Sequence, residues 1–240
     1  DTFSMLLDRK VPMEQKAFAV GLRIQHPQKM INLSQYGREE AGALGAATYK
    51  LTRQTTSGRG VYSFCMCPGG YVVNASSESG RLAVNGMSYH DRAGENANSA
   101  LIVTVTPEDF PEGGALGGVA FQRKLEEEAY QAAGGKIPVQ LYGDFCQHVI
   151  SRKLGGVNPQ MRGEWAFGDV RSILPEPLNL AMMEAMDGFG HMIRGFDRPD
   201  ADFEGVERRT SSQVRIWRDD QCEREMRGLY HSGEGAGSAG

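Results

Sequence analysis

Two cysteines lie one residue apart in the string Cys65-Met66-Cys67. In a regular β-strand, residues two apart point to the same face, so both thiols would lie on one side, with Cβ atoms about 7 Å apart. This spacing favours a redox-active thiol pair, or thiols that line a cofactor site. The alternative is two small buried apolar residues, because free cysteine is among the most buried residue types. We take Cys65 and Cys67 as the candidate catalytic residues.

A metal centre at these cysteines would need further ligands. The remaining cysteines, Cys146 and Cys222, and the five histidines do not stand at metal-ligand spacing. Asp197, Asp200 and Asp202 are of the right type for a hard cation, but their segment lacks the glycine and the distal glutamate of a calcium loop. We therefore expect no metal site and interpret the three aspartates as part of an acidic surface loop.

Directly after the cysteines, Gly69 and Gly70 could let a cofactor approach the backbone closely, or could form a tight turn between strands. A loop just before a later strand is predicted to contain Arg92, Glu95, Asn96 and Asn98, whose arginine and asparagine side chains offer several hydrogen-bond donors in fixed geometry and so suit recognition of a polar ligand. The same side chains could instead cap the loop by bonding to its backbone. The candidate substrate-binding residues of this region are Asn85, Arg92 and Asn98.

Two further polar strings lie near the end of the sequence. Arg209 and Ser211 belong to a segment rich in arginine and hydroxyl side chains, which could bind a carboxylate or phosphate or could be a solvated strand edge. In Gly233-Glu234-Gly235, glycines could clear room for a nucleotide cofactor while the carboxylate bonds a ribose or ribityl hydroxyl. A flexible tail is the alternative. No Gly-x-Gly-x-x-Gly fingerprint of a dinucleotide-binding fold follows a predicted strand elsewhere in the sequence. We therefore expect no complete dinucleotide-binding fold in this chain.

Hydrophobic periodicity indicates the elements that would position these residues. Short apolar runs bounded by turn residues predict a meander of strands between residues 61 and 106, and the alternation from Phe18 to Ile24 predicts another strand. We expect an α+β fold, with helices packed on a mixed, largely antiparallel sheet built on residues 16–25 and 47–106. Helices are predicted at 1–10, 28–36, 118–133 and 177–193, loops at 38–46, 151–173 and 196–205, a segment that is helical at its end at 139–149, and strands at 47–53 and within 206–217.

The composition is that of a soluble globular protein. The 240 residues are 40% hydrophobic and 23% charged, with a formal net charge of -4, so there is no basic footprint for nucleic acid. No apolar run approaches the roughly 20 residues that span a bilayer. Four cysteines are too few for a disulfide framework, and we therefore expect a reducing, cytoplasmic location.

One motif is long and chemically unusual, Ser63-Phe64-Cys65-Met66-Cys67-Pro68-Gly69-Gly70. Together with the other motifs it resembles the family of uncharacterised bacterial FAD-dependent dehydrogenases, flavoproteins with a Rossmann-type FAD domain and a large inserted domain. The resemblance runs through most of the chain. The segments that carry it are 18–28, 62–70, 85–88, 96–101, 209–212 and 233–237.

The resemblance implies that this chain is the inserted domain, cut between two FAD-contacting segments. Residues 1–227 would form the substrate or cap domain, and residues 228–240 would be the truncated start of the returning FAD-binding segment. On this mapping Glu234 matches the acid near the ribityl chain, with Gly233 and Gly235 beside it. FAD would be the cofactor of the parent protein. Because the phosphate-binding motif is missing, we expect this chain alone to hold FAD weakly or not at all and to be inactive.

The predicted function is therefore to cover the flavin and form the substrate pocket of an FAD-dependent oxidoreductase of the dehydrogenase type. Its expected partners are a small-molecule substrate and the rest of its own FAD domain. Two other hypotheses stay open at this point: a non-catalytic domain that binds a ligand or partner, and a flavin-free thiol redox module. A glycine fingerprint upstream in the parent reading frame would favour the flavoenzyme.

Overall fold

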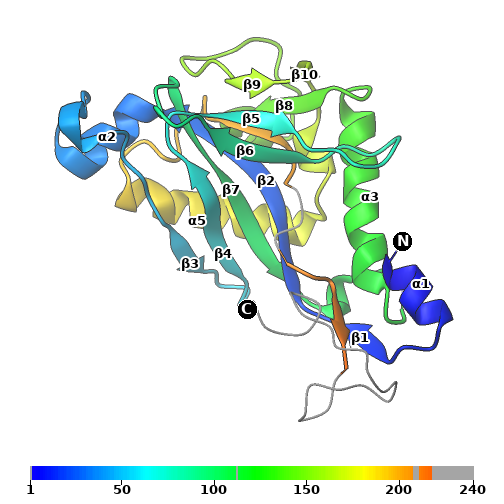
Figure 1. The fold of residues 1–240 in the computed structure, drawn as a ribbon. Coiled ribbons are helices and arrows are strands. Elements are labelled where there is room, and N and C mark those ends of the chain that lie inside the picture. The colour runs from blue at the N-terminus through cyan, green and yellow to red at the C-terminus, as the bar shows by residue number, and fades with distance from the viewer. Residues whose placement is uncertain (1, 112, 208–210, 218–240) are drawn as a thin grey trace. The chain divides into compact units, whose positions relative to one another are not determined.

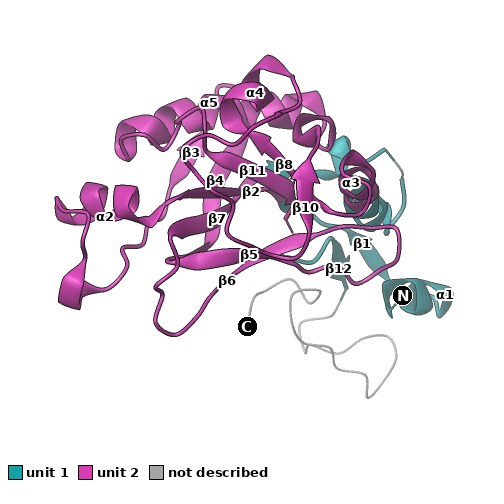
Figure 2. Ribbon diagram, turned by 90° about the horizontal axis from the view of Figure 1, so that it is seen from above, with its two compact units in different colours: residues 1–19, 104–124, 209–240 teal, residues 20–103, 125–208 magenta. Residues whose placement is uncertain are grey.

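The computed structural model describes residues 2–111, 113–207 and 211–217, in two compact units. Unit 1 comprises residues 1–19, 104–124 and 209–240, and unit 2 comprises residues 20–103 and 125–208 (Figure 2). Unit 2 carries most of the candidate site residues, so we describe it first. Among the described residues, no helix has both the length and the apolar character needed to cross a membrane.

A seven-stranded sheet forms the centre of unit 2 (Figure 1). Its strand order is β10-β8-β11-β2-β7-β4-β3. The β10–β8 pair is parallel, and β11 pairs antiparallel with both β2 and β8, as β4 does with β3 and β7. The strands are β2 (Phe18–Pro27), β3 (Thr52–Gln54), β4 (Gly60–Cys67), β7 (Asn96–Val105), β8 (Ile137–Leu141), β10 (Trp165–Phe167) and β11 (Asp202–Val206).

Strand β2 is the most deeply enclosed strand of this sheet. Every residue from Phe18 to His26 is buried, on both faces of the strand. Figure 2 shows why: helices α4 (Tyr142–Gln147) and α5 (Glu176–Met192) lie on one side of the sheet, and β5 and β6 lie on the other. The period-two alternation in β2 therefore does not separate buried from exposed residues. It separates an apolar face from a polar face, and both are covered.

A second, three-stranded sheet covers the polar face of the large sheet. It consists of β5 (Gly70–Asn74), β6 (Val84–Ser88) and β9 (Met161–Arg162), in the order β6-β5-β9. Strands β5 and β6 are antiparallel, and β9 is parallel to β5. Helix α2 (Gln28–Tyr36) follows β2 directly and ends at Gly37, whose left-handed backbone (φ 72°) suits glycine. A single turn, η1 (Gly42–Leu44), follows it.

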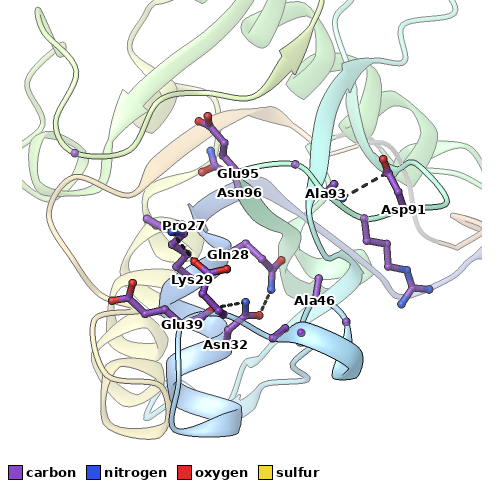
Figure 3. A pocket seen from close by; sticks show the side chains of 17 residues that line it. Pro27, Gln28, Lys29, Asn32, Glu39, Ala46, Asp91, Ala93, Glu95 and Asn96 are labelled. Carbon is purple, nitrogen blue, oxygen red and sulfur yellow. Dashed lines mark hydrogen bonds and ion pairs between the residues drawn. The ribbon is translucent and has the colours of Figure 1, made fainter.

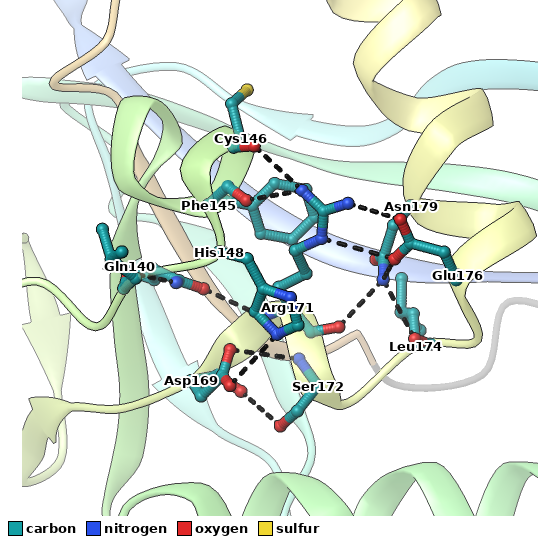
Figure 4. A network of polar contacts seen from close by, with 11 residues as sticks. Gln140, Phe145, Cys146, His148, Asp169, Arg171, Ser172, Leu174, Glu176 and Asn179 are labelled. Carbon is teal, nitrogen blue, oxygen red and sulfur yellow. Dashed lines mark hydrogen bonds and ion pairs between the residues drawn. The ribbon is translucent and has the colours of Figure 1, made fainter.

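A buried arginine, Arg171 in the short helix η3 (Val170–Ser172), joins the two helices α4 and α5 (Figure 4). Its Nη1 donates to the carbonyl oxygens of Phe145 and Cys146, at 2.9 and 3.1 Å, near the end of α4. Its guanidinium also pairs with Glu176, the first residue of α5. A cation near the last carbonyls of one helix and an acid in the first turn of the next both match the helix dipoles, so this network is structural.

Unit 1 has a small core of its own. Helix α1 (Thr2–Asp8) precedes a two-stranded antiparallel sheet of β1 (Met13–Gln15) and β12 (Val214–Ile216), and Val11, Val214 and Ile216 form its buried cluster. The rings of Phe18, Phe110 and Phe121 pack at centroid distances between 5.5 and 6.5 Å. The turn η2 (Pro107–Asp109) also belongs to this unit, and helix α3 (Gly117–Ala132) begins in it.

The α+β fold with a mixed, largely antiparallel sheet is confirmed, but several predicted loops and the extent of the sheet were wrong. The acidic loop predicted at 196–205 contains β11, and the loop predicted at 151–173 contains β9, β10 and η3. The predicted strand 47–53 is confined to β3, and 139–149 divides into the end of β8 and helix α4. Strands with acidic or glycine-rich sequences form here because neighbouring strands pair with them along the sheet.

Candidate functional site

A buried arginine lies directly beneath the two cysteines. Arg23 of β2 is fully buried, and its Nη2 donates to the carbonyl oxygen of Cys65 at 2.6 Å and to Cys67 Sγ at 3.4 Å. Its Nε donates to Asn98 Oδ1 at 2.9 Å, and its Nη1 pairs with Glu207 Oε2 at 3.0 Å. The arginine therefore ties the cysteine segment of β4 to β7 and to the residue that follows β11.

A glycine makes room for this arginine under the small sheet. A Cβ atom at Gly86 of β6 would lie 1.9 Å from Arg23 Nη2 and 2.4 Å from Asn98 Oδ1. Both atoms belong to fully buried residues and are hydrogen-bonded, so moving either of them would break a buried hydrogen bond. Gly86 is therefore the residue that lets the small sheet close over the polar face.

The cysteine segment is not a regular strand. The pairing of β4 with β7 shifts register between Phe64 and Cys67, and Cys65 has a positive φ of 45°. Such a bulge separates the surroundings of residues two apart, and Cys65 is exposed while Cys67 is half-buried. Burial raises the pKa of both thiols, and the Arg23 guanidinium only partly offsets this. A raised pKa lowers the thiolate fraction, so this environment does not activate either cysteine as a nucleophile.

Farther along the same polar face lie two buried carboxyl groups, Asp202 and Glu204 of β11. Burial raises the pKa of Asp202 to about 8 and raises that of Glu204 well above its ordinary value. Glu204 Oε1 accepts from Gln25 Nε2 at 2.6 Å. Among the described residues, neither oxygen of Asp202 nor Glu204 Oε2 has a hydrogen-bond partner. Near neutral pH the carboxyl groups of Asp202 and Glu204, which with Arg23 and Gln25 form a polar layer on this face, are therefore mainly protonated.

The turn after the cysteines is built by backbone packing between glycines. A Cβ atom on Gly69 would lie 1.8 Å from the carbonyl oxygen of Arg92, and one on Gly94 would lie 2.6 Å from that of Gly69. The amide of Gly94 donates to the carbonyl of Gly69 at 3.0 Å. A Cβ atom on Gly70 would lie 2.5 Å from the carbonyl of Met87. The atoms nearest to the Cβ side of these glycines are therefore mostly the protein's own backbone, and cofactor contact by Gly69 and Gly70 stays a prediction.

A pocket of about 680 Å³ opens beside this turn (Figure 3). Its walls are the start of α2, the segment 39–46, and the loop 91–95 with Asn96, the first residue of β7. Gln28, at the start of α2, bonds two neighbouring segments: its Oε1 accepts from the amide of Gly69 at 2.7 Å, and its Nε2 donates to Asn32 Oδ1 in the same helix and to the carbonyl of Ala47, both at 2.9 Å. Asn32 in turn donates to the carbonyl of Glu39 at 2.7 Å. Because Gln28 and Asn32 are both buried, the pocket has a rigid floor.

The structure places the predicted site residues in different surroundings. Arg92 lines the pocket, whereas Asn98 lies under the cysteines and bonds Arg23, so neither Asn98 nor Asn96 is a loop residue. Asn85 Oδ1 accepts from the next amide, that of Gly86, at 2.8 Å. Ser211 belongs to unit 1. The remaining candidates lie outside the described residues: Arg209, Gly233, Glu234 and Gly235.

Sequence reasoning missed the polar layer and the floor of the pocket. The usable signal was the alternation of Arg23 and Gln25 with apolar residues in a strand, repeated by Asp202 and Glu204. Gln28 carried no such signal, because nothing in its spacing marks it as a residue that bridges three segments. Within the described part of the chain, no group of three or more His, Cys, Asp or Glu residues could hold a metal ion.

Comparison with known proteins places this chain in a family. Residues 17–210 match the family described as FAD-dependent protein, C-terminal domain-like. A protein from Clostridium beijerinckii, described only as an uncharacterized protein, is 49% identical over 245 residues. That alignment covers 100% of this chain but 46% of the relative, so the chain spans less than half of the relative's length. Since the match extends over most of the sequence, the chain belongs to the family of FAD-dependent proteins, C-terminal domain-like.

Proposed function

We propose that this chain is the domain of an FAD-dependent oxidoreductase that covers the flavin and forms the substrate pocket. The observation that carries the proposal is the pocket of about 680 Å³ beside the Cys-Pro-Gly-Gly turn, in a chain that belongs to an FAD-dependent family. A volume of this size is typical of sites for small organic molecules. The relative is more than twice as long as the segment that aligns with this chain. In a protein of that length, the part outside this chain would hold the cofactor.

The cofactor and the described residues would have different roles. Bound FAD supplies hydride or electron transfer, and the protein contributes positioning and electrostatics. The side chains of Gln28 and Asn32 fix the pocket walls through five hydrogen bonds, and Arg23 fixes the cysteine bulge. Sites built on such bonded elements hold a ligand in one orientation. The bulge gives the two thiols different surroundings, and burial raises the pKa of both, so a flavin-free thiol redox module has less support.

The test compares this chain with the protein encoded by the full reading frame that contains it. Both are incubated with FAD, separated from unbound flavin, and measured by visible absorption. We expect a flavin band in the longer protein and none in this chain. The full-length relative from C. beijerinckii, 49% identical, serves as a second example. If neither longer protein retains flavin, the proposal is wrong.

Covering of the flavin is tested separately by solute access. Iodide quenches the fluorescence of flavin that it can contact, so a covered flavin is quenched less than unbound FAD. We expect a lower quenching constant for the longer protein than for FAD in the same buffer. Equal quenching would show that the domain leaves the flavin open and would contradict the role proposed here.

A further inference from the structure

Acidic side chains outnumber basic ones around the pocket. Its lining includes the acids Glu39, Glu40, Asp91 and Glu95 but only two bases, Lys29 and Arg92, which gives a formal charge of 2 − 4 = −2. Lys29 Nζ is 2.8 Å from Glu40 Oε1, so this base is already neutralised. The potential in the pocket therefore favours a cationic ligand.

A buried amide on the pocket wall adds a second, independent preference. Asn96 is 4% exposed, and both hydrogens of its Nδ2 are donated, to Gln25 Oε1 at 2.9 Å and to the carbonyl of Asn158 at 2.8 Å. Its orientation is thereby fixed, with Oδ1 as the remaining acceptor of this side chain; no described residue donates to it. Asn96 lines the pocket, and its Oδ1 is not among the fully buried atoms without a partner, so this acceptor is accessible to a hydrogen-bond donor of a ligand.

The pocket edges also present acceptors. Glu95 Oε2 receives one long bond, 3.3 Å from Gln160 Nε2. Asp91 Oδ1 receives one of 3.4 Å from the amide of Ala93 (Figure 3). Charge-assisted bonds to a carboxylate are normally shorter, about 2.7–2.9 Å, so both carboxylates have acceptor capacity left. An ammonium group has three donors and no acceptor, which matches this wall.

We propose that the pocket binds a small organic molecule through an amino group, which donates to Asn96 Oδ1 and pairs with the surrounding carboxylates. That this molecule is the substrate rests on the function proposed above, whereas its binding does not. Arg92 also lines the pocket and is exposed. Its positive charge could pair with a carboxylate on the same ligand, so the ligand can be an amine that also carries a carboxylate. The competing possibility, an anion held by Arg92 and Lys29, is decided by the same experiment.

The experiment is isothermal titration calorimetry of this chain with four probes that share a four-carbon skeleton. They are 1,4-diaminobutane, 4-aminobutanoate, 1,4-butanediol and succinate. We expect 1:1 binding of at least one of the two amines, about tenfold tighter or more than that of the diol or succinate, which corresponds to the roughly 1.4 kcal/mol of one charge-assisted bond. Tighter binding of succinate, or no saturable heat with either amine, would overturn the proposal.

Matched substitutions locate the binding site. Glu39→Gln and Glu95→Gln remove one charge each from exposed positions in the pocket, so the fold is retained, and each should weaken amine binding about tenfold. Glu164→Gln is the control, because Glu164 is exposed and pairs with Lys136 outside the pocket. Equal weakening in all three variants would indicate non-specific attraction and would count against the site. Because no flavin takes part, a negative result here is distinct from loss of FAD binding in the longer protein.

Discussion

The buried carboxyl of Asp202 predicts a measurable dependence of stability on pH. Its side chain is fully buried, neither oxygen has a partner among the described residues, and burial raises its pKa to about 8. The unfolded chain loses this proton near pH 4, whereas the folded chain keeps it until about pH 8. Between these values the native state binds more protons, so the free energy of unfolding falls as pH rises.

The magnitude follows from the width of this window. Each unit of pKa difference corresponds to about 1.4 kcal/mol, so the interval from pH 5 to pH 8 costs the wild-type protein about 4 kcal/mol through Asp202. Asn has nearly the same shape and no charge to lose. We therefore expect Asp202→Asn to be about 4 kcal/mol more stable, relative to wild type, at pH 8 than at pH 5.

The assay is urea unfolding at both pH values, followed by the fluorescence of Trp165. This residue lies in β10, in the same sheet as Asp202, and replacing Trp217 by Phe removes the signal from unit 1. Glu204 also has a raised pKa, first because of burial and second because of the nearby Asp202, so the difference between variant and wild type reports Asp202 together with its coupling to Glu204. If that difference is the same at pH 5 and pH 8, the reasoning about Asp202 is wrong.

Three further predictions follow from contacts described above. Arg23→Met leaves a buried carboxylate without its partner and should lower the free energy of unfolding by about 3–5 kcal/mol in urea titrations; a loss below about 1 kcal/mol would contradict a buried ion pair. Gly86→Ala should lower the free energy of unfolding by about 1–3 kcal/mol, because its Cβ would meet Arg23. Gly113→Ala is the control, because its Cβ meets nothing within 4 Å, and it should change the melting temperature little. Similar shifts of the melting temperature in both variants would contradict close packing at Gly86. Replacing Cys65 and Cys67 together by Ser should reduce turnover of the longer protein if either thiol is redox-active, and unchanged turnover would exclude that role.

The α+β class and the helices near 28–36, 118–133 and 177–193 could be predicted because their signals are local. Apolar spacing, Gly37 after one helix and proline at the start of another act within a few residues of the chain. The strands around the cysteines were predictable for the same reason, but their arrangement as one meander was wrong, because β4 pairs with β7 in the large sheet while β5 and β6 belong to the small sheet. Strand β11 was not, because its burial depends on β2 and β8, which are distant in sequence.

The candidate site shows the same limit. Arg92 could be singled out from its type and its loop, and it does line the pocket. Asn98 was predicted as a ligand-binding residue, but its Oδ1 is bonded to a buried arginine that sequence spacing does not connect with it. The two glycines of the turn suggested room for a cofactor, whereas a Cβ atom on Gly69 would meet the carbonyl oxygen of Arg92 and one on Gly70 would meet that of Met87. Which group fills a space is a property of the tertiary structure and has no local signature.

The order of strands in the large sheet also bears on how the protein is made. The two neighbours of strand β2 are β7 and β11, and its Arg23 bonds Asn98, 75 residues later, and Glu207, 184 residues later. The central strand therefore stays without one neighbour until nearly the whole domain has left the ribosome. Contacts so far apart in sequence slow folding and leave unpaired strand edges accessible meanwhile. The protein should thus depend on chaperones during synthesis more than a helical domain of equal length would.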